Sequence, residues 1–249
     1  MSSTSYPWNT PSEKVILAEN EVHVWRALLE MPLSTINFLQ QVLSNEEIER
    51  AKRFYFEKDR RCWTVARGVL RMLLGQYLGI GPGEVQFATN DYGKPSIASP
   101  AYGVRLHFNL SHSGDRALYA FAYDRQVGID VEYMRANIDC EALAKSLFSP
   151  YECGILQALP AAMQSEVFFQ CWSRKEAYIK ARGKGLSIPL DQFDVSLKPG
   201  EPAALLGSRE DPQATARWSL HALAPGNDYA GTLVVEGSNY YLSCWQWQE

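Results

Sequence analysis

The segment Val127-Gly-Ile-Asp-Val-Glu132 places two carboxylates in an otherwise apolar, β-branched stretch. In a β-strand, residues i and i+2 point to the same face, so Asp130 and Glu132 lie together while Ile129 and Val131 point into a core. Two carboxylates this close repel each other, and a cation between them removes the repulsion. A solvated acidic strand face is the simpler alternative. The segment therefore predicts a strand and leaves a metal site and a solvated face both open.

A second informative stretch lies on a helix predicted near the other end of the chain, within 169–182. Glu176 and Lys180 are four residues apart, and Trp172 comes four residues before Glu176, so the three side chains share one helical face. A surface salt bridge is one explanation of the charged pair. The other is that Glu176 is a third oxygen ligand or a base, while Lys180 faces a phosphate. Gly183-Lys-Gly185 then ends the helix at a flexible corner.

Two polar turns earlier in the chain offer groups that bind anions. Phe108-Asn-Leu-Ser-His-Ser-Gly114 runs from a strand into a turn, where His112 either binds a phosphate or caps the turn. In Tyr92-Gly-Lys-Pro95, glycine and proline hold Lys94 at a loop tip, as a solvated cation or as a phosphate clamp. The helices before these turns carry basic residues, most of which are expected to be solvated surface residues. One or two of them are expected to contact a phosphate. These basic residues are Arg50, Lys52, Arg53, Lys58, Arg60, Arg61 and Arg67.

The spacing of apolar residues predicts both helices and strands along the chain. Residues 1–20 are polar and predict a loose arm. Strands are expected at 22–28, 106–110, 118–123 and 127–132, with a β-rich tail at 218–247. Helices are expected at 59–78, 138–147, 150–159 and 165–182.

A faint internal repeat connects the two halves of the chain. Ser44-Asn-Glu-Glu47 is a capping box before one helix, and Ser149-Pro-Tyr-Glu152 has the same form before another. The offset is 105 at these serines and 109 between Trp63 and Trp172. Chance similarity of two amphipathic helices is the alternative to a duplicated α/β unit with a cleft between its copies.

Composition excludes several other classes of protein. The chain has 249 residues and a net charge of −4, which gives no general attraction to nucleic acid or to an anionic membrane. No apolar run approaches the ~20 residues of a membrane span, and the N-terminus does not read as a secretory signal. The five cysteines are scattered, as is typical of reduced thiols in a cytoplasmic protein.

No nucleotide-binding glycine loop, Rossmann fingerprint, nucleophile elbow or metal-type histidine spacing is present in the sequence. What remains is three carboxylates suited to a hard cation, with dispersed lysine, arginine, serine and histidine suited to a polyphosphate. This set points to metal-assisted phosphoryl chemistry on a large ligand that carries phosphates.

Four short motifs in fixed order give the chain a family resemblance. Y-G-K-P at 92–95, N-x-S-H-S at 109–113, G-I-D-V-E at 128–132 and W-S-x-K-E-A-x-x-K at 172–180 resemble the surfactin-type 4'-phosphopantetheinyl transferases. Gly-Lys-Gly-Leu-Ser-Ile-Pro-Leu190 follows in register, and the resemblance covers about 43–196.

The resemblance implies an α+β fold and a substrate. The fold is a pseudo-twofold pair of similar α/β subdomains, each a small, mainly antiparallel sheet packed on a long helix, with halves at 1–124 and 125–249. The resemblance implies that coenzyme A and Mg²⁺ lie in the cleft of a monomer, with Mn²⁺ as the alternative ion. The 4'-phosphopantetheine arm passes to a serine of an apo acyl or peptidyl carrier protein, and 3',5'-ADP leaves.

The resemblance also assigns roles to individual residues. Asp130, Glu132 and Glu176 match metal ligands, and Glu176 is the expected general base, with Glu152 as the second candidate. Lys180 faces the pyrophosphate and stabilises the leaving group. The residues expected to bind coenzyme A are Arg50, Lys94, Asn109, Ser111, His112, Lys175 and Lys180.

Two other classes of function remain open from the residues alone. A metal-dependent phosphohydrolase would use the same carboxylates, with water in place of the carrier serine, on a nucleotide or on coenzyme A. A non-enzymatic binding protein would use the charged residues as surface salt bridges.

Overall fold

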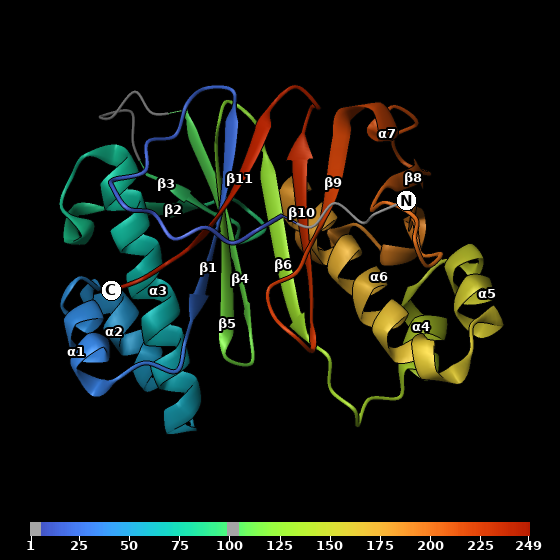
Figure 1. The fold of residues 1–249 in the computed structure, drawn as a ribbon, viewed down its shortest axis with the longest axis horizontal. Helices are drawn as coiled ribbons and strands as arrows, with labels where there is room; N and C mark the ends of the chain where they lie inside the picture. The colour runs from blue at the N-terminus through green and yellow to red at the C-terminus, as the bar shows by residue number, and fades with distance from the viewer. Residues whose placement is uncertain (1–5, 99–104) are drawn as a thin grey trace.

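The computed structural model describes residues 6–98 and 105–249, and Figure 1 shows these as four layers. Two sheets stand in the middle, with helices on the outer side of each. The helices are α1 (Leu33–Gln41), α2 (Asn45–Lys52), α3 (Glu57–Leu78), α4 (Cys140–Leu147), α5 (Pro150–Ala158), α6 (Ala161–Arg182) and α7 (Ala214–Arg217). The strands are β1 (Glu21–Leu28), β2 (Phe87–Thr89), β3 (Pro95–Ile97), β4 (Leu106–Ser113), β5 (Arg116–Tyr123), β6 (Val127–Tyr133), β7 (Phe193–Val195), β8 (Leu205–Ser208), β9 (Trp218–Leu223), β10 (Tyr229–Glu236) and β11 (Tyr241–Gln246).

The first sheet has the strand order β11-β1-β5-β4, and α3 packs on its outer face. Alternation along β5 divides its side chains between two cores. Tyr119 and Phe121 pack under α3, whereas Leu118 and Ala120 face the second sheet. The sheet is antiparallel except for the parallel pair of β1 and β11.

The second sheet has the strand order β6-β10-β9, entirely antiparallel, with α6 on its outer face. Ile129 and Val131 on β6 join Leu233 on β10 in the core between the two sheets. Gly128 permits the close approach of β6 to α6, because a Cβ there would collide with the backbone of Ala177 and Ala181. Two sheets, each packed on one 22-residue helix, confirm the expected α+β pair of subdomains.

The internal repeat is present, with a different register from the one expected at the tryptophans. Both capping boxes form, at Ser44 and at Ser149. The helices α3 and α6 end at Gly79 and Gly183, both at φ +68°, which gives an offset of 104 from 79 to 183. The correspondence of Trp63 with Trp172 was therefore wrong, because the helix ends, not the tryptophans, define equivalent positions.

The two halves exchange segments at both ends of the chain. β11 pairs with β1, so a strand from the C-terminal half of the sequence belongs to the first sheet. The division at 124 and 125 falls between β5 and β6, but residues 241–246 cross it.

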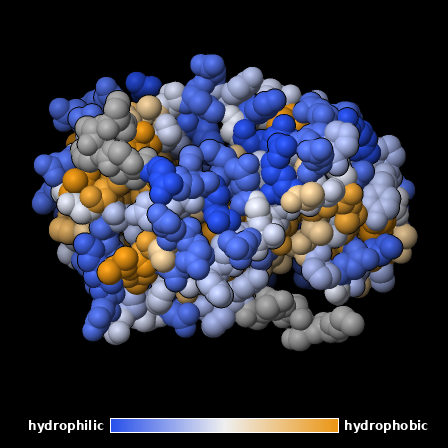
Figure 2. Space-filling model, turned by 90° about the horizontal axis from the view of Figure 1, so that it is seen from above, coloured by the Kyte–Doolittle hydropathy of each residue, from blue (hydrophilic) through white to orange (hydrophobic). Residues whose placement is uncertain are grey.

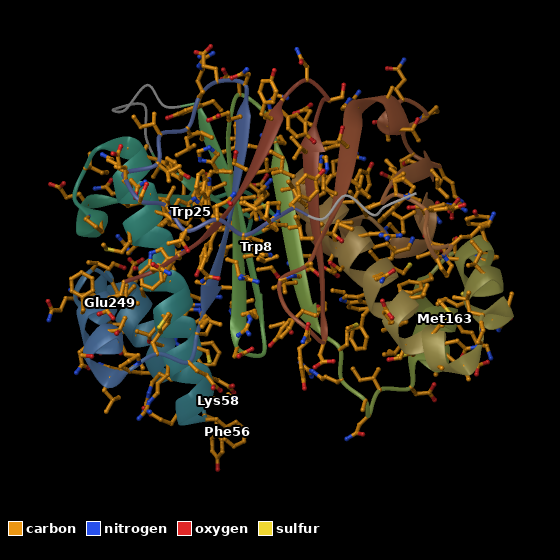
Figure 3. All side chains as sticks on the ribbon, viewed as in Figure 1. Trp8, Trp25, Phe56, Lys58, Met163 and Glu249 are labelled. Atoms are coloured by element: carbon orange, nitrogen blue, oxygen red, sulfur yellow. The ribbon has the colours of Figure 1, made fainter. Side chains whose placement is uncertain are left out.

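The N-terminal arm is anchored, contrary to the expectation of a loose segment, wherever the structure describes it. Tyr6 Oη lies 2.8 Å from His221 Nδ1, and Trp8 Nε1 donates to the Ala224 carbonyl at 2.6 Å. Trp8 lies over the middle of the molecule, where the sheets meet (Figure 3). The polar composition of the arm predicted no anchoring, but the aromatic rings of Tyr6 and Trp8 pack against the core between the sheets.

The surface is mostly polar on the side seen from above, where apolar residues form separate areas among hydrophilic ones (Figure 2). None of the described helices combines the length and the apolar character needed to cross a membrane.

Candidate active site

The two carboxylates of β6 share one face of the strand, as the alternation predicted. Ile129 and Val131 point into the core between the sheets, and Asp130 and Glu132 point toward α6. Asp130 is only 1% exposed. A solvated acidic face is thereby excluded for Asp130.

Asp130 has one satisfied and one unsatisfied oxygen. Its Oδ1 accepts from Lys180 Nζ at 2.6 Å and from Ser111 Oγ at 3.0 Å. Its Oδ2 is buried and has no hydrogen-bond partner. A buried carboxylate oxygen without a donor is costly, so this atom marks a place where a cation or a donor is needed.

Glu132 lies one strand repeat further along β6. Its carboxylate accepts from Trp172 Nε1 at 3.1 Å and from Ser113 Oγ at 3.2 Å. Burial and the nearby charge of Asp130 raise the pKa of Glu132 to about 7. Trp172 thus orients the Glu132 carboxylate from α6, a role that the helical stripe did not predict.

Glu176 is half-buried on α6, one turn before Lys180. Burial and the charge of Asp130 raise its pKa, against the opposing effect of Lys180. A carboxyl group with a raised pKa is a better proton acceptor than an ordinary solvated glutamate. The structure therefore brings Asp130, Glu132, Glu176 and Lys180 into one electrostatic cluster.

The cluster is not arranged as a finished metal site. Among residues 6–98 and 105–249, no three Asp, Glu, His or Cys side chains meet closely enough to hold a metal ion as they stand. The Lys180 ammonium occupies one side of Asp130. The donor set nevertheless fits a hard divalent cation, since it consists of carboxylate oxygens and includes the unpartnered Asp130 Oδ2.

Three polar side chains of β4 reach across to β6. Asn109 Oδ1 accepts from the Ile129 amide at 2.8 Å, and Ser113 Oγ accepts from the Tyr133 amide at 3.1 Å. Ser111 donates to Asp130 between them. Residues i, i+2 and i+4 of one strand face thus join two strands that belong to different sheets. Asn109 is buried, and its side chain contacts the backbone of Ile129 and not the cleft where coenzyme A was expected.

A cleft of about 700 Å³ lies next to the carboxylates. Four residues that the sequence predicted line it: Arg50, Ser111, His112 and Lys180. Its other lining residues include Trp63 and Phe87, which were not predicted, and Arg67, which belongs to the basic set expected to supply one or two phosphate contacts. Only Lys180 comes from the second half, so the first half supplies most of the surface for a phosphate-bearing ligand.

Arg67 is a cation of the cleft that is held by two neighbouring side chains. Its guanidinium lies 3.8 Å from the centre of the Phe87 ring and pairs with Glu47, the capping-box glutamate of α2. Arg71 holds the other oxygen of Glu47 at 2.6 Å. The arginines' spacing on α3 is i, i+4, and this spacing, combined with the capping box, was the available signal for the cluster.

His112 is exposed toward the cleft, in agreement with an anion-binding position. The protein that surrounds its exposed ring desolvates the charged form and, with the neighbouring Lys180 cation, lowers the pKa of His112. At neutral pH the ring is therefore mainly a neutral hydrogen-bonding group until an anion binds beside it.

Lys94 does not point into this cleft. Its ammonium donates to Gln126 Oε1 and to the carbonyls of Val127 and Ala181, each at 3.2 Å. Burial lowers the pKa of Lys94 to about 8. The loop tip folds over the end of α6, so Lys94 joins the two halves and does not bind phosphate in this arrangement.

Lys175 and Glu152 form a fully buried pair that does not line the cleft, with both side chains 0% exposed and 2.7 Å between the charged atoms. Lys175 also donates to the carbonyls of Leu190 and Phe193. Glu152 also accepts from the amides of Ser149 and Val195. The expected coenzyme A contact of Lys175 and the candidate base role of Glu152 were wrong, because both groups are consumed by structural bonds.

A cleft lined by cations beside clustered carboxylates is typical of an enzyme that acts on a phosphate-bearing ligand. Comparisons with known proteins agree. The family described as "4'-phosphopantetheinyl transferase superfamily" matches residues 126–234, and "4'-phosphopantetheinyl transferase, N-terminal" matches residues 30–123.

Two relatives matched by sequence give the same result. The 4'-phosphopantetheinyl transferase HetI of Nostoc sp. (strain PCC 7120) is 40% identical over 242 residues, covering 97% of this chain and 99% of that relative. The transferase Sfp of Bacillus subtilis (strain 168) is 36% identical over 155 residues, covering 62% and 66%. Among solved structures, the holo-[acyl-carrier-protein] synthase of Thermotoga maritima matches 45% of this chain and 63% of its own, with 21% identity and a TM-score of 0.38.

The chain belongs to the 4'-phosphopantetheinyl transferase family, of the surfactin type that its motifs resembled. Its activity is the transfer of a 4'-phosphopantetheinyl group. The binding-protein and phosphohydrolase alternatives therefore give way to a transferase.

Proposed function

We propose that the chain transfers the 4'-phosphopantetheine arm of coenzyme A to a serine of an apo acyl or peptidyl carrier protein, with Mg²⁺ held by Asp130, Glu132 and Glu176. The observation that carries this proposal is the buried Asp130 Oδ2 without a partner, beside a cleft lined by cations. Bound here, Mg²⁺ supplies charge that offsets the negative phosphate oxygens. The proposal includes action as a monomer in the cytoplasm.

The residues of the chain divide the remaining work. Arg50, Arg67 and His112 line the cleft and suit the phosphates of coenzyme A. Lys180 reaches both Asp130 and Ser111, so its ammonium lies at the border between carboxylates and cleft. There it can stabilise charge on the departing 3',5'-ADP.

Glu176 is proposed to accept the proton of the carrier serine. It is half-buried, its pKa is raised, and it lies one helical turn from Lys180. The serine oxygen then forms a bond to the β-phosphorus, and the bond from that phosphorus to the oxygen of 3',5'-ADP breaks.

The test is intact-mass analysis of apo-carriers incubated with the protein, coenzyme A and Mg²⁺. Wild-type protein and the control Glu166→Gln, an exposed glutamate on the same helix, should convert the carrier. Glu176→Gln should convert it at a severely reduced rate, and raising the pH should restore little. Normal turnover by Glu176→Gln would overturn its role as base, and cleavage of coenzyme A without any carrier would favour the hydrolase.

A further inference from the structure

The turn between β4 and β5 is fastened to the second half of the molecule by one tyrosine. Tyr229 Oη accepts from the Asp115 amide at 3.1 Å and donates to the carboxylate of the same residue. Tyr229 is the first residue of β10 and pairs with Tyr133 at the end of β6. The hydroxyl therefore connects a hairpin of the first sheet with the start of the central strand of the second sheet.

The tyrosine is held from several sides. Its ring packs on Tyr133 with the ring centres 5.2 Å apart, and the Arg116 guanidinium lies 5.6 Å from its centre. Burial opposes ionisation of Asp115, but the bonds from Tyr229 and Arg116 lower its pKa overall, so it remains an acceptor. At Gly114, a Cβ would collide with the Tyr229 hydroxyl, so the turn fits closely around it.

The fastened turn carries the hydroxyl that binds Glu132. Ser113, one residue before Gly114, donates to Glu132 Oε2 and accepts from the Tyr133 amide. Since β4 and β6 belong to different sheets, side chains and not a strand ladder set their spacing. Tyr229 bonds the turn that follows Ser113, and it pairs with Tyr133, the residue after Glu132.

We propose that Tyr229 is a positioning residue of the transferase, whose hydroxyl locks the β4–β5 hairpin onto the end of β6 so that Ser113 holds Glu132 in its ligand orientation. This inference rests on the proposed function of Glu132. The residue acts through Ser113 and need not touch coenzyme A.

The experiment compares Tyr229→Phe with the matched control Tyr240→Phe. Tyr240 also uses its hydroxyl, 2.5 Å from His221 Nε2, but it lies away from the hairpin. Binding of Mn²⁺ to the substrate-free protein is measured by electron paramagnetic resonance, with kcat and KM from carrier conversion. Tyr229→Phe should lose up to about 10-fold in Mn²⁺ affinity, the lower limit for removing an outer-shell partner, because it acts one contact further out, through Ser113. Its kcat should fall while the KM for coenzyme A stays within about twofold, and Tyr240→Phe should match the wild type in all three.

A double mutant identifies the route. Ser113→Ala should reproduce the loss in Mn²⁺ affinity, and Tyr229→Phe combined with Ser113→Ala should add little to either single change, because both act on one contact. Mn²⁺ affinity of Tyr229→Phe equal to that of Tyr240→Phe, or fully additive effects with Ser113→Ala, would overturn the positioning role alone. Wild-type protein that binds no Mn²⁺ would overturn the proposed metal site as well.

Discussion

In each half of the molecule a capping box begins the short helix before the main helix, at α2 and at α5, and the two halves use its glutamate differently. In the first half, the capping-box residue Glu47 pairs with Arg67 and Arg71 and lines the cleft. In the second half, the equivalent Glu152 pairs with Lys175 in the interior, with both side chains fully buried. The same sequence signature thus builds part of a binding surface in one copy and part of a core in the other.

The charges of the cleft follow the same division. The first half presents Arg50, Arg67 and His112, whereas the second presents Asp130, Glu132 and Glu176 with Lys180. A repeated fold with unlike surfaces thus places cations opposite carboxylates. Under the proposed function, the second half would carry the chemistry and the first would hold the ligand.

The largest effect is expected from Asp130→Asn. Asparagine keeps an acceptor for Lys180 and Ser111 but puts an amide donor in the position of the unpartnered Oδ2. We expect transfer to fall about 1,000-fold, since a bound metal contributes several kcal/mol and each 1.36 kcal/mol is tenfold in rate. Rates are followed by intact mass of the carrier. Asp194→Asn, which removes a carboxylate paired with Arg209, is the control and should keep the wild-type rate. Equal transfer rates for the two variants would contradict the proposed role of Asp130 as a metal ligand.

Glu152→Gln should be the most destabilising single change at the capping boxes. It leaves the Lys175 charge in the interior without its partner, and such a loss costs about 3–5 kcal/mol of unfolding free energy. Denaturant unfolding measures the change, and transfer below the unfolding range should persist. If Glu152→Gln kept full stability but lost transfer, Glu152 would return as a candidate base.

Glu47→Gln should cost less stability, about 1–2 kcal/mol, because its arginine partners keep other contacts. It should raise the KM for coenzyme A severalfold, since Arg67 loses its anchor. The arginines and the Ser44 amide hold the pKa of Glu47 below its ordinary value of 4.5 despite burial. Its stabilisation is therefore complete above that value and is lost as the pH falls through the lower, folded pKa. Acid unfolding of Glu47→Gln should lack this component, and identical acid profiles would contradict the pairing.

The smallest effect is expected at the junction of the halves, where Lys94 donates to two carbonyls of the second half. Burial lowers its pKa from 10.5 to about 8, so the unfolded chain binds more protons between these values. Stability of the wild type should therefore rise relative to Lys94→Met as the pH increases across this interval. Denaturant unfolding of both proteins at a series of pH values measures the difference, and a difference independent of pH would contradict burial of the ammonium.

Much of the site followed from sequence because its geometry is local. Alternation alone placed Asp130 and Glu132 on one side of β6, and helical spacing placed Glu176 and Lys180 on one face of α6. The family motifs added the reaction and the cleft. Arg50, Ser111, His112 and Lys180 do line that cleft.

The errors fall where a side chain's partner is far away in sequence. Lys175 and Lys180 are five residues apart on α6, yet one is sealed beneath the loop at Leu190 and Phe193 and the other borders the cleft. Lys94 and Asn109 likewise found acceptors and donors in the second half. No local pattern distinguishes these cases, because the spacing of a motif says nothing about what packs over it.

The sequence by itself determined the long helices and the main strands, though not α1, as well as the paired capping boxes and the direction of the β6 carboxylates. Each of these depends on periods of two or 3.6 residues and on neighbours a few positions away. Only the tertiary structure decided which charges are buried and which are available. That choice depends on long-range packing: β11 closing the first sheet, β4 meeting β6, and Tyr229 closing over the hairpin. Burial sets the cost of leaving a charge or a polar atom without a partner. For that reason the capping-box glutamate is structural in the second half, as Glu152, and borders the cleft in the first half, as Glu47.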